Sequence, residues 1–154
     1  MNSLTIFVFI IFLSVSIYFA FSLKKREKIK LNRESAWPEV LDLIISALQS
    51  GASISESLSN LGRVGPNAIK NAFKKFEEDV LSGKKFDDCL TDLKKEFADP
   101  ISDQLFECLY FAAKFGSKNT VKVLRELSEY VSADLALRAE INTRFGWIRN
   151  SANL

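Results

Sequence analysis

Histidine is absent from this chain of 154 residues, and glycine, proline and cysteine occur only six, three and two times. Without histidine, the chain lacks the most common general base and the most common ligand of transition metals. Its few glycines are scattered and form none of the glycine-rich loops that hold nucleotide phosphates. The sequence therefore predicts a protein that is not an enzyme and that binds no cofactor and no metal ion.

An excess of charge of one sign is also missing, because 21 basic residues face 19 acidic ones and the net charge is +2. Binding to nucleic acid depends on a strongly basic surface, so we expect no nucleic-acid partner. The two cysteines, Cys89 and Cys108, lie far apart at apolar positions of helical patterns. We therefore expect two buried, reduced thiols rather than a redox pair.

Two short acidic runs, residues 77–79 and 87–88, are the only other candidates for chemistry. An enzyme that works with carboxylates, or a Ca²⁺ site, is the functional interpretation of such runs. Neighbouring acids on a helix point in different directions and do not form the oxygen cage that Ca²⁺ requires. A solvated helix surface explains these residues better.

What the chain does contain is one uncharged apolar run, residues 4–23. About 20 residues at 1.5 Å each span a hydrocarbon core of ~30 Å. A basic cluster follows this run and has no counterpart before it: Lys24, Lys25, Arg26, Lys28 and Lys30. The positive-inside rule then predicts a transmembrane helix over residues 1–23, with the N-terminus outside and the rest of the chain in the cytoplasm. Each basic residue near anionic membrane lipid contributes about 1 kcal/mol.

A cleaved signal peptide is the main alternative for the apolar run. It would carry its positive charge before the run and would end in small residues. Here the charge follows the run, and bulky Tyr18, Phe19 and Phe21 stand near its end. These features favour a plasma-membrane anchor. The segment that follows, residues 24–36, is charged and lacks a sustained apolar face, so it is either a basic juxtamembrane linker or a solvated helical extension.

From residue 37 onward, apolar residues recur at helical spacing and never alternate as in a strand. The first predicted helix begins at Trp37 with Pro38 in its first turn and ends at Gly51. Ser53 begins the second, and Glu56 three residues later completes a capping box. The sequence thus predicts an all-α fold, in which an N-terminal transmembrane helix precedes a six-helix bundle over residues 37–154.

The third predicted helix covers about residues 66–82, after breaks at Gly62 and at Gly65-Pro66. Gly83 ends it as a left-handed cap.

Three further helices complete the predicted bundle. The fourth carries Phe86, Cys89 or Leu90, Leu93 and Phe97 on its apolar side, and Asp99 then caps a fifth that begins at Pro100. This fifth helix, about residues 100–115, is apolar on nearly all sides, so we expect it at the centre of the bundle. The sixth begins near Asn119 or Thr120, and it is much longer than the others if its apolar pattern continues through Ile141 to the end.

Four motifs follow one another along residues 37–127. They are Trp37-Pro38 at a helix start, Leu48-x-x-Gly51-x-Ser53-x-x-Glu56-x-Leu58, Asp99-Pro100 before an apolar helix, and Gly116 followed by Val123-Leu124-x-x-Leu127. Their order and spacing resemble the type II secretion system F domain, and most of all its TadB-like variety from tight-adherence (Tad/Flp) pilus systems. The resemblance covers residues 37–153.

This resemblance implies a scaffold protein without enzymatic activity, the cytoplasmic domain of an inner-membrane assembly platform. The implied partners are membrane lipid, a hexameric secretion ATPase, other platform subunits, pilins and further copies of the chain. Such a platform couples the ATPase to pilin assembly. Family members carry further membrane spans after the domain, so we expect this chain to be shortened before them. The other function left open is a single-span, membrane-anchored regulatory adaptor.

Residues that contact partners are expected on exposed polar helix surfaces. The candidates are Lys70, Lys74 and Lys75 on the third predicted helix, or Arg125 and Glu129 on the sixth.

Overall fold

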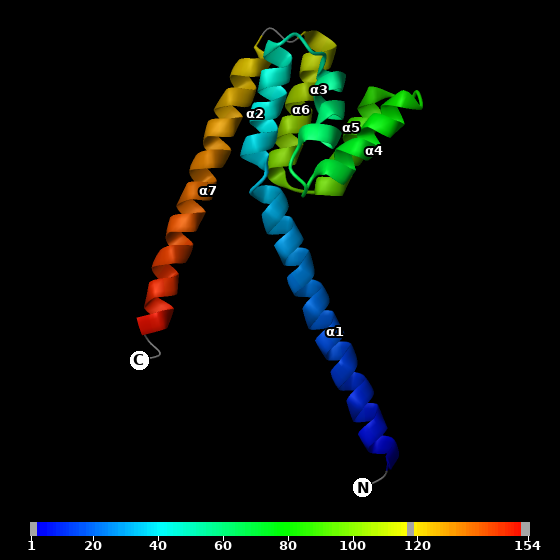
Figure 1. The fold of residues 1–154 in the computed structure, drawn as a ribbon, viewed down its shortest axis with the longest axis vertical. Helices are drawn as coiled ribbons and strands as arrows, with labels where there is room; N and C mark the ends of the chain where they lie inside the picture. The colour runs from blue at the N-terminus through cyan, green and yellow to red at the C-terminus, as the bar shows by residue number, and fades with distance from the viewer. Residues whose placement is uncertain (1–2, 117–118, 152–154) are drawn as a thin grey trace. The chain divides into compact units, whose positions relative to one another are not determined.

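The computed structural model describes the backbone of residues 3–116 and 119–151, and the side chains of residues 11–19, 22, 24, 27–116 and 119–144. These residues form seven helices and no strand (Figure 1), which confirms the predicted all-α class. The chain divides into two compact units, one ending at Glu34 and the other starting at Ser35. Each unit is described by itself.

The N-terminal unit is a single helix, α1 (Ser3–Glu34). It continues through the charged segment, so a helical extension is what the structure has there. Within the part of the chain that is described, no helix meets the length and apolarity needed to cross a membrane. Half of the apolar run 4–23 lies outside the residues whose side chains are described, namely residues 4–10, 20, 21 and 23. The transmembrane anchor therefore stays a prediction.

The second unit is a closed ring of six helices. They are α2 (Trp37–Gln49), α3 (Ile54–Val64), α4 (Lys70–Leu81), α5 (Phe86–Phe97), α6 (Pro100–Phe115) and α7 (Thr120–Ser151). Each helix packs against the next one along the chain, and α7 packs back against α2. This arrangement confirms the predicted six-helix bundle, in which the second half of α7 extends beyond the other helices (Figure 1).

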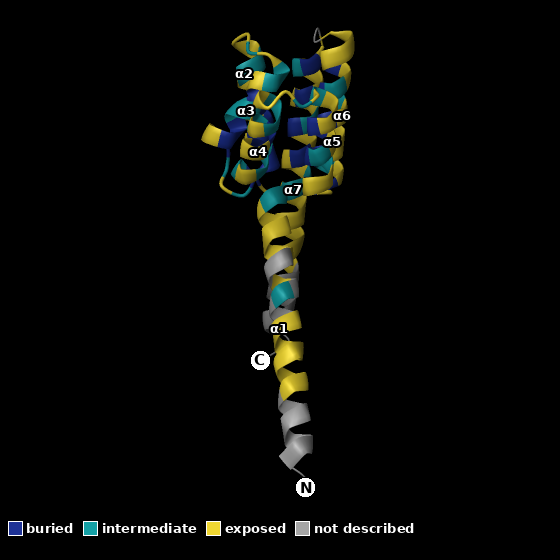
Figure 2. Cartoon of the chain, turned by 90° about the vertical axis from the view of Figure 1, so that its right-hand side faces the viewer, coloured by how far each residue is buried: buried dark blue, intermediate teal, exposed yellow. Residues whose placement is uncertain are grey.

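Aromatic rings from four different helices meet inside the ring. Trp37 of α2 lies edge-on to Phe97 of α5, with ring centroids 5.0 Å apart. Phe97 also contacts Phe73 of α4 at 5.7 Å and Phe106 of α6 at 6.1 Å. Such pairs contribute about 0.5–1.5 kcal/mol each beyond the burial of their surface. Figure 2 shows the buried residues on the inward sides of these helices.

Side-chain caps determine several helix ends as the sequence predicts. The backbone N–H of Glu56 donates to Ser53 Oγ (3.2 Å), and the backbone N–H of Ser53 donates to Glu56 Oε2 (2.9 Å). Asp99 Oδ1 accepts from the backbone N–H groups of Ile101 (2.9 Å) and Ser102 (3.1 Å). Gly83 follows α4 with φ = 86°, a left-handed conformation that favours glycine.

Two predictions about the segment between α3 and α4 are wrong. The helix begins at Lys70 and not at Pro66, because the backbone of Ile69 (φ −117°) departs from helical geometry and residues 66–69 form a turn. Gly62 does not break the chain, since it lies inside α3. A Cβ atom at Gly62 would stand 2.9 Å from the backbone nitrogen of Lys74, so this glycine allows α3 and α4 to approach closely.

The predicted central position of α6 is also wrong. Its inner face is buried, including Leu105 and Leu109, but α6 is one member of the ring between α5 and α7. Because a ring member keeps one side in solvent, Phe111 and Phe115 are exposed. Their rings stack with centroids 6.1 Å apart.

Candidate partner surfaces

The acidic runs of the sequence form ion pairs between neighbouring helices. Glu77 of α4 lies 3.7 Å from Arg63 of α3, and Asp87 of α5 lies 3.4 Å from Lys114 of α6. Among the described residues, no group of cysteine, aspartate or glutamate side chains is arranged to hold a metal ion. The acidic residues thus form ion pairs on the outer surface of the bundle, which agrees with the solvated-surface interpretation.

Lys84 connects α4 to α5 from the loop between them. Its Nζ lies 3.2 Å from Asp79 Oδ2 on α4 and also donates to Asp92 Oδ2 on α5. Hydrogen bonds to the two carboxylates raise the pKa of Lys84, and its ammonium group lowers the pKa of Asp92. Lys84 and Asp92 therefore stay charged near neutral pH, and the contacts of Lys84 join α4 to α5.

Neither cysteine has the environment of a reactive thiol. Cys89 is buried on α5 and Cys108 is half-buried on α6, and both thiols are free. Burial raises the pKa of each thiol, which disfavours the nucleophilic thiolate.

The predicted lysines of α4 differ in what they contact. Lys70 is half-buried, whereas Lys74 and Lys75 are exposed. The stem of Lys74 lies against α3, with its Cγ 3.1 Å from where a Gly62 Cβ would be. Lys75 borders an open cleft of about 410 Å³ between α4 and α5, whose rim also carries Asp92 and other charged groups. This cleft has charges of both signs at its rim and the buried side chains of Phe76 and Leu93 in its lining, and its open form suits contact with a protein surface.

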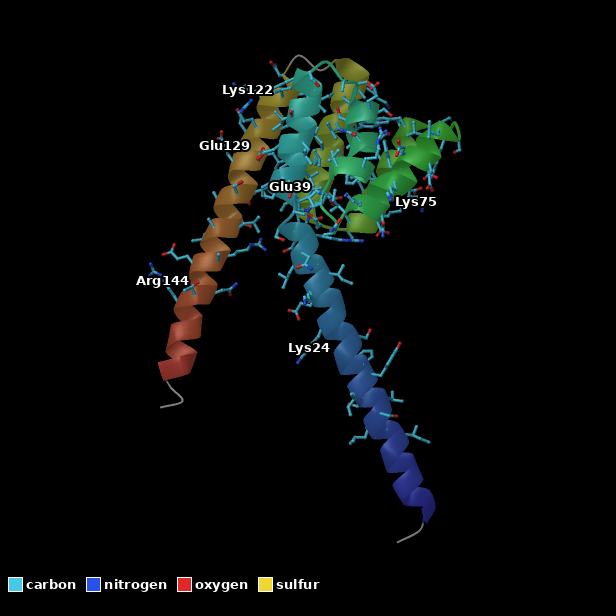
Figure 3. All side chains as sticks on the ribbon, viewed as in Figure 1. Lys24, Glu39, Lys75, Lys122, Glu129 and Arg144 are labelled. Carbon is cyan, nitrogen blue, oxygen red and sulfur yellow. The ribbon has the colours of Figure 1, made fainter. Side chains whose placement is uncertain are left out.

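The predicted residues of α7 belong to a different surface. Arg125 and Glu129 are both exposed. In Figure 3, Glu129 on α7 and Lys75 on α4 point away from opposite sides of the helical ring. The structure therefore brings Lys70 and Lys75 onto one helix but separates them from Arg125 and Glu129. Whether either surface contacts a partner stays a prediction.

The predicted basic cluster lies along α1. Lys24, Lys28 and Lys30 are exposed, and Figure 3 shows Lys24 projecting from the helix. Lys30 lies 3.8 Å from Glu34, one turn further along. The side chains of Lys25 and Arg26 lie outside the described residues.

The prediction missed the exposed aromatic pair of α6, Phe111 and Phe115. The available signal was the apolar arc of α6, which is wider than one buried face needs. We interpreted that width as evidence for a central helix, whereas on a ring member it leaves apolar side chains in solvent.

Comparison with protein families supports the resemblance found in the sequence. The family model described as type II secretion system (T2SS), protein F, matches residues 40–149. The matched region begins inside α2 and ends inside α7, so it includes all or part of each of the six helices of the ring. The match is to the family as a whole and does not distinguish its TadB-like variety. No curated protein and no solved structure matches the chain.

Proposed function

Because the chain belongs to the type II secretion system protein F family, we propose that it is a component of an inner-membrane assembly platform for a Tad-type pilus or a type II-like secretion machine. The observation that carries this proposal is the family match over residues 40–149, which coincides with the closed helical ring. In this role the chain catalyses no reaction. It couples a cytoplasmic secretion ATPase to pilin assembly through contacts between protein surfaces.

The proposed platform is anchored through residues 4–23, with the N-terminus outside and the ring in the cytoplasm. The supporting observation is the asymmetry of charge, because the basic cluster follows the apolar run. A reporter that functions only in the cytoplasm, fused after Leu154, should be active. Activity of a reporter that functions only in the periplasm would overturn the orientation and the proposed role with it.

We place the ATPase contact on the α4 surface around Lys70 and Lys75. Lysines on an exposed helix speed the encounter with an acidic partner surface, and their effect depends on salt. Binding should weaken as the Debye length falls from ~10 Å at 0.1 M to ~3 Å at 1 M ionic strength. The contact should be of modest affinity, since a coupling element must release its partner in each cycle.

A pull-down of the cognate secretion ATPase, using the full chain inserted in membranes, tests both the α4 contact and its dependence on salt. The double variant Lys70→Glu/Lys75→Glu should lose most of the bound ATPase at low salt. Arg125→Glu on the other side of the ring is the matched control and should bind normally. Lys74 is left unchanged because its stem packs on α3.

Each failure of this pull-down has its own meaning. No binding by the unaltered chain at low salt would overturn the platform role and favour the regulatory adaptor. Normal binding by Lys70→Glu/Lys75→Glu would leave the platform role in place and exclude the α4 surface as the contact. ATP hydrolysis by the purified chain alone would contradict the absence of enzymatic activity.

A further inference from the structure

The joint between α5 and α6 concentrates backbone strain at one residue. Ala98 follows α5 with φ = 48° and ψ = 46°, a left-handed conformation that is unfavourable for a residue with a Cβ atom. Within the described part of the chain, it is the only residue other than glycine with a positive φ. The next residue cannot take over the turn, because Pro100 and the cap of α6 keep Asp99 extended. The change of direction between the two helices therefore depends on Ala98.

A buried polar group without a partner lies beside this joint. Trp37 of α2 is fully buried, and its indole Nε1–H has no hydrogen-bond acceptor among the described residues. The indole lies edge-on to Phe97, the last residue of α5, and to Phe106 of α6, whose ring centroid is 6.4 Å away. A buried donor without an acceptor is unfavourable in the closed ring, and water that reached it would supply one.

The end of α5 is loosely held at its sides. An open cleft of about 410 Å³ lies between α5 and α4, and another of about 350 Å³ lies between α5 and α6. Among residues 94–98, which form the last turn of α5 and the joint, Phe97 alone is buried. Little apolar surface therefore keeps this end of the helix in place.

Charged side chains connect α5 to both neighbouring helices. Lys94 donates to Glu107 of α6 at the second cleft, and Lys84 joins Asp92 to α4. These groups are partly exposed, so salt screens their attraction and each pair contributes little to stability. Contacts of this kind break and form again without unfolding of the ring.

We propose that residues 94–98 form a conformational switch, in which the end of α5 detaches reversibly from the closed ring. On opening, the ion pair with α6 breaks, Phe97 leaves Trp37, and water reaches the indole Nε1–H. Ala98 then leaves its left-handed conformation. One movement thus relieves both unfavourable features of the closed ring, while the burial of Phe97 opposes it and keeps the closed state in the majority. The proposal concerns the ring alone and does not rest on the proposed function.

Hydrogen exchange of the Trp37 indole N–H tests the proposal, followed by NMR in D₂O with the full chain in detergent micelles. Trp147→Phe leaves Trp37 as the single tryptophan and serves as the parent for every variant. Backbone N–H groups of Leu41 and Ile44 on α2 report unfolding of the whole ring. Relative to intrinsic rates, the indole N–H should exchange on the order of ten-fold faster than these groups, and low urea concentrations should accelerate the α2 groups but not the indole.

Two variants and salt change the switch in opposite directions. Ala98→Gly removes the strain of the closed state and should slow indole exchange about five-fold. Lys94→Gln removes the ion pair with α6 and should accelerate exchange about two-fold, and so should a rise from 0.1 M to 1 M salt.

Matched controls separate these effects from general ones. Ala113→Gly places a glycine inside α6 and should not slow the exchange. Arg144→Gln removes an ion pair that stays within α7 and should leave the rate unchanged. Circular dichroism melts check that each variant is folded.

Three results would overturn the proposal. Indole exchange with the rate and the urea dependence of the α2 groups would show that Trp37 meets water only when the whole ring unfolds. An unchanged rate in Ala98→Gly would show that opening does not relieve the joint. An unchanged rate both in Lys94→Gln and at 1 M salt would show that the contact with α6 does not hold the switch closed.

Discussion

A single glycine determines how closely α3 and α4 approach each other. Replacing a glycine inside a helix with alanine ordinarily stabilises a protein by about 0.5–1 kcal/mol. At Gly62 the new Cβ would lie 2.9 Å from the backbone nitrogen of Lys74, and a backbone atom cannot rotate away. We therefore expect Gly62→Ala to reduce the free energy of unfolding by about 1–3 kcal/mol, measured by urea denaturation with an unchanged slope.

Ser59→Ala is the control for this change, because it lies one turn earlier on the same helix and points into an open groove. Its effect should stay within about 0.5 kcal/mol. An unchanged or higher denaturation midpoint for Gly62→Ala would contradict the close approach of the two helices.

At the scale of the helix, a helix end can be predicted from sequence when a side chain close to it in the chain forms the cap. Ser53 and Asp99 cap their helices through atoms two or three residues away, so the pattern contains the whole interaction. Gly62 and Gly51 look alike in the sequence, yet Gly51 ends α2 with φ = 92° while Gly62 faces α4. Only the neighbouring helix distinguishes the two glycines.

In the candidate surfaces, too, some features follow from the sequence and others depend on how the helices pack. Exposure of Lys75 and Glu129 follows from the helical period, and both are exposed. Their separation onto two sides of the ring depends on the order in which the helices pack, and so does the exposure of Phe115. Helical periodicity gives the inward side of each helix but not its neighbours, so these features were beyond a prediction from sequence.

The cap of α6 gives a prediction at the scale of one helix. Asp99 Oδ1 accepts two backbone N–H groups and is buried. Asp99→Ala leaves these donors without that partner, so we expect a loss of about 1–2 kcal/mol in the free energy of unfolding. Asp99→Asn keeps an acceptor oxygen and should lose less. Thermal melts followed by circular dichroism compare the two, and equal losses would argue against the cap.

The capping box of α3 should make stability depend on pH. The hydrogen bond from the Ser53 backbone N–H lowers the pKa of Glu56 below its ordinary value of 4.5. Because the folded-state pKa is lower than the unfolded one, the stabilisation is complete above the unfolded pKa and is lost as pH falls through the folded pKa. The unaltered chain should exceed Glu56→Gln in stability at neutral pH, and this difference should shrink below about pH 4. A difference that does not vary from pH 7 to pH 3 would contradict this role of the carboxylate.

At the scale of the whole second unit, closure of the ring makes its helices depend on one another. α7 packs back against α2, and aromatic rings of four helices meet in one core, so loss of one helix opens the inner faces of the others.

Leu105 lies fully buried at this core on α6. An unpaired carboxylate there costs several kcal/mol, a large part of the about 5–15 kcal/mol that holds a typical domain folded. Leu105→Asp should therefore abolish the cooperative melt of the whole unit rather than that of α6 alone. Gln104→Asp places the same charge on the adjacent exposed position and should melt normally. A partial loss of helical signal in Leu105→Asp, with a cooperative transition remaining, would mean that the six helices do not fold as one ring.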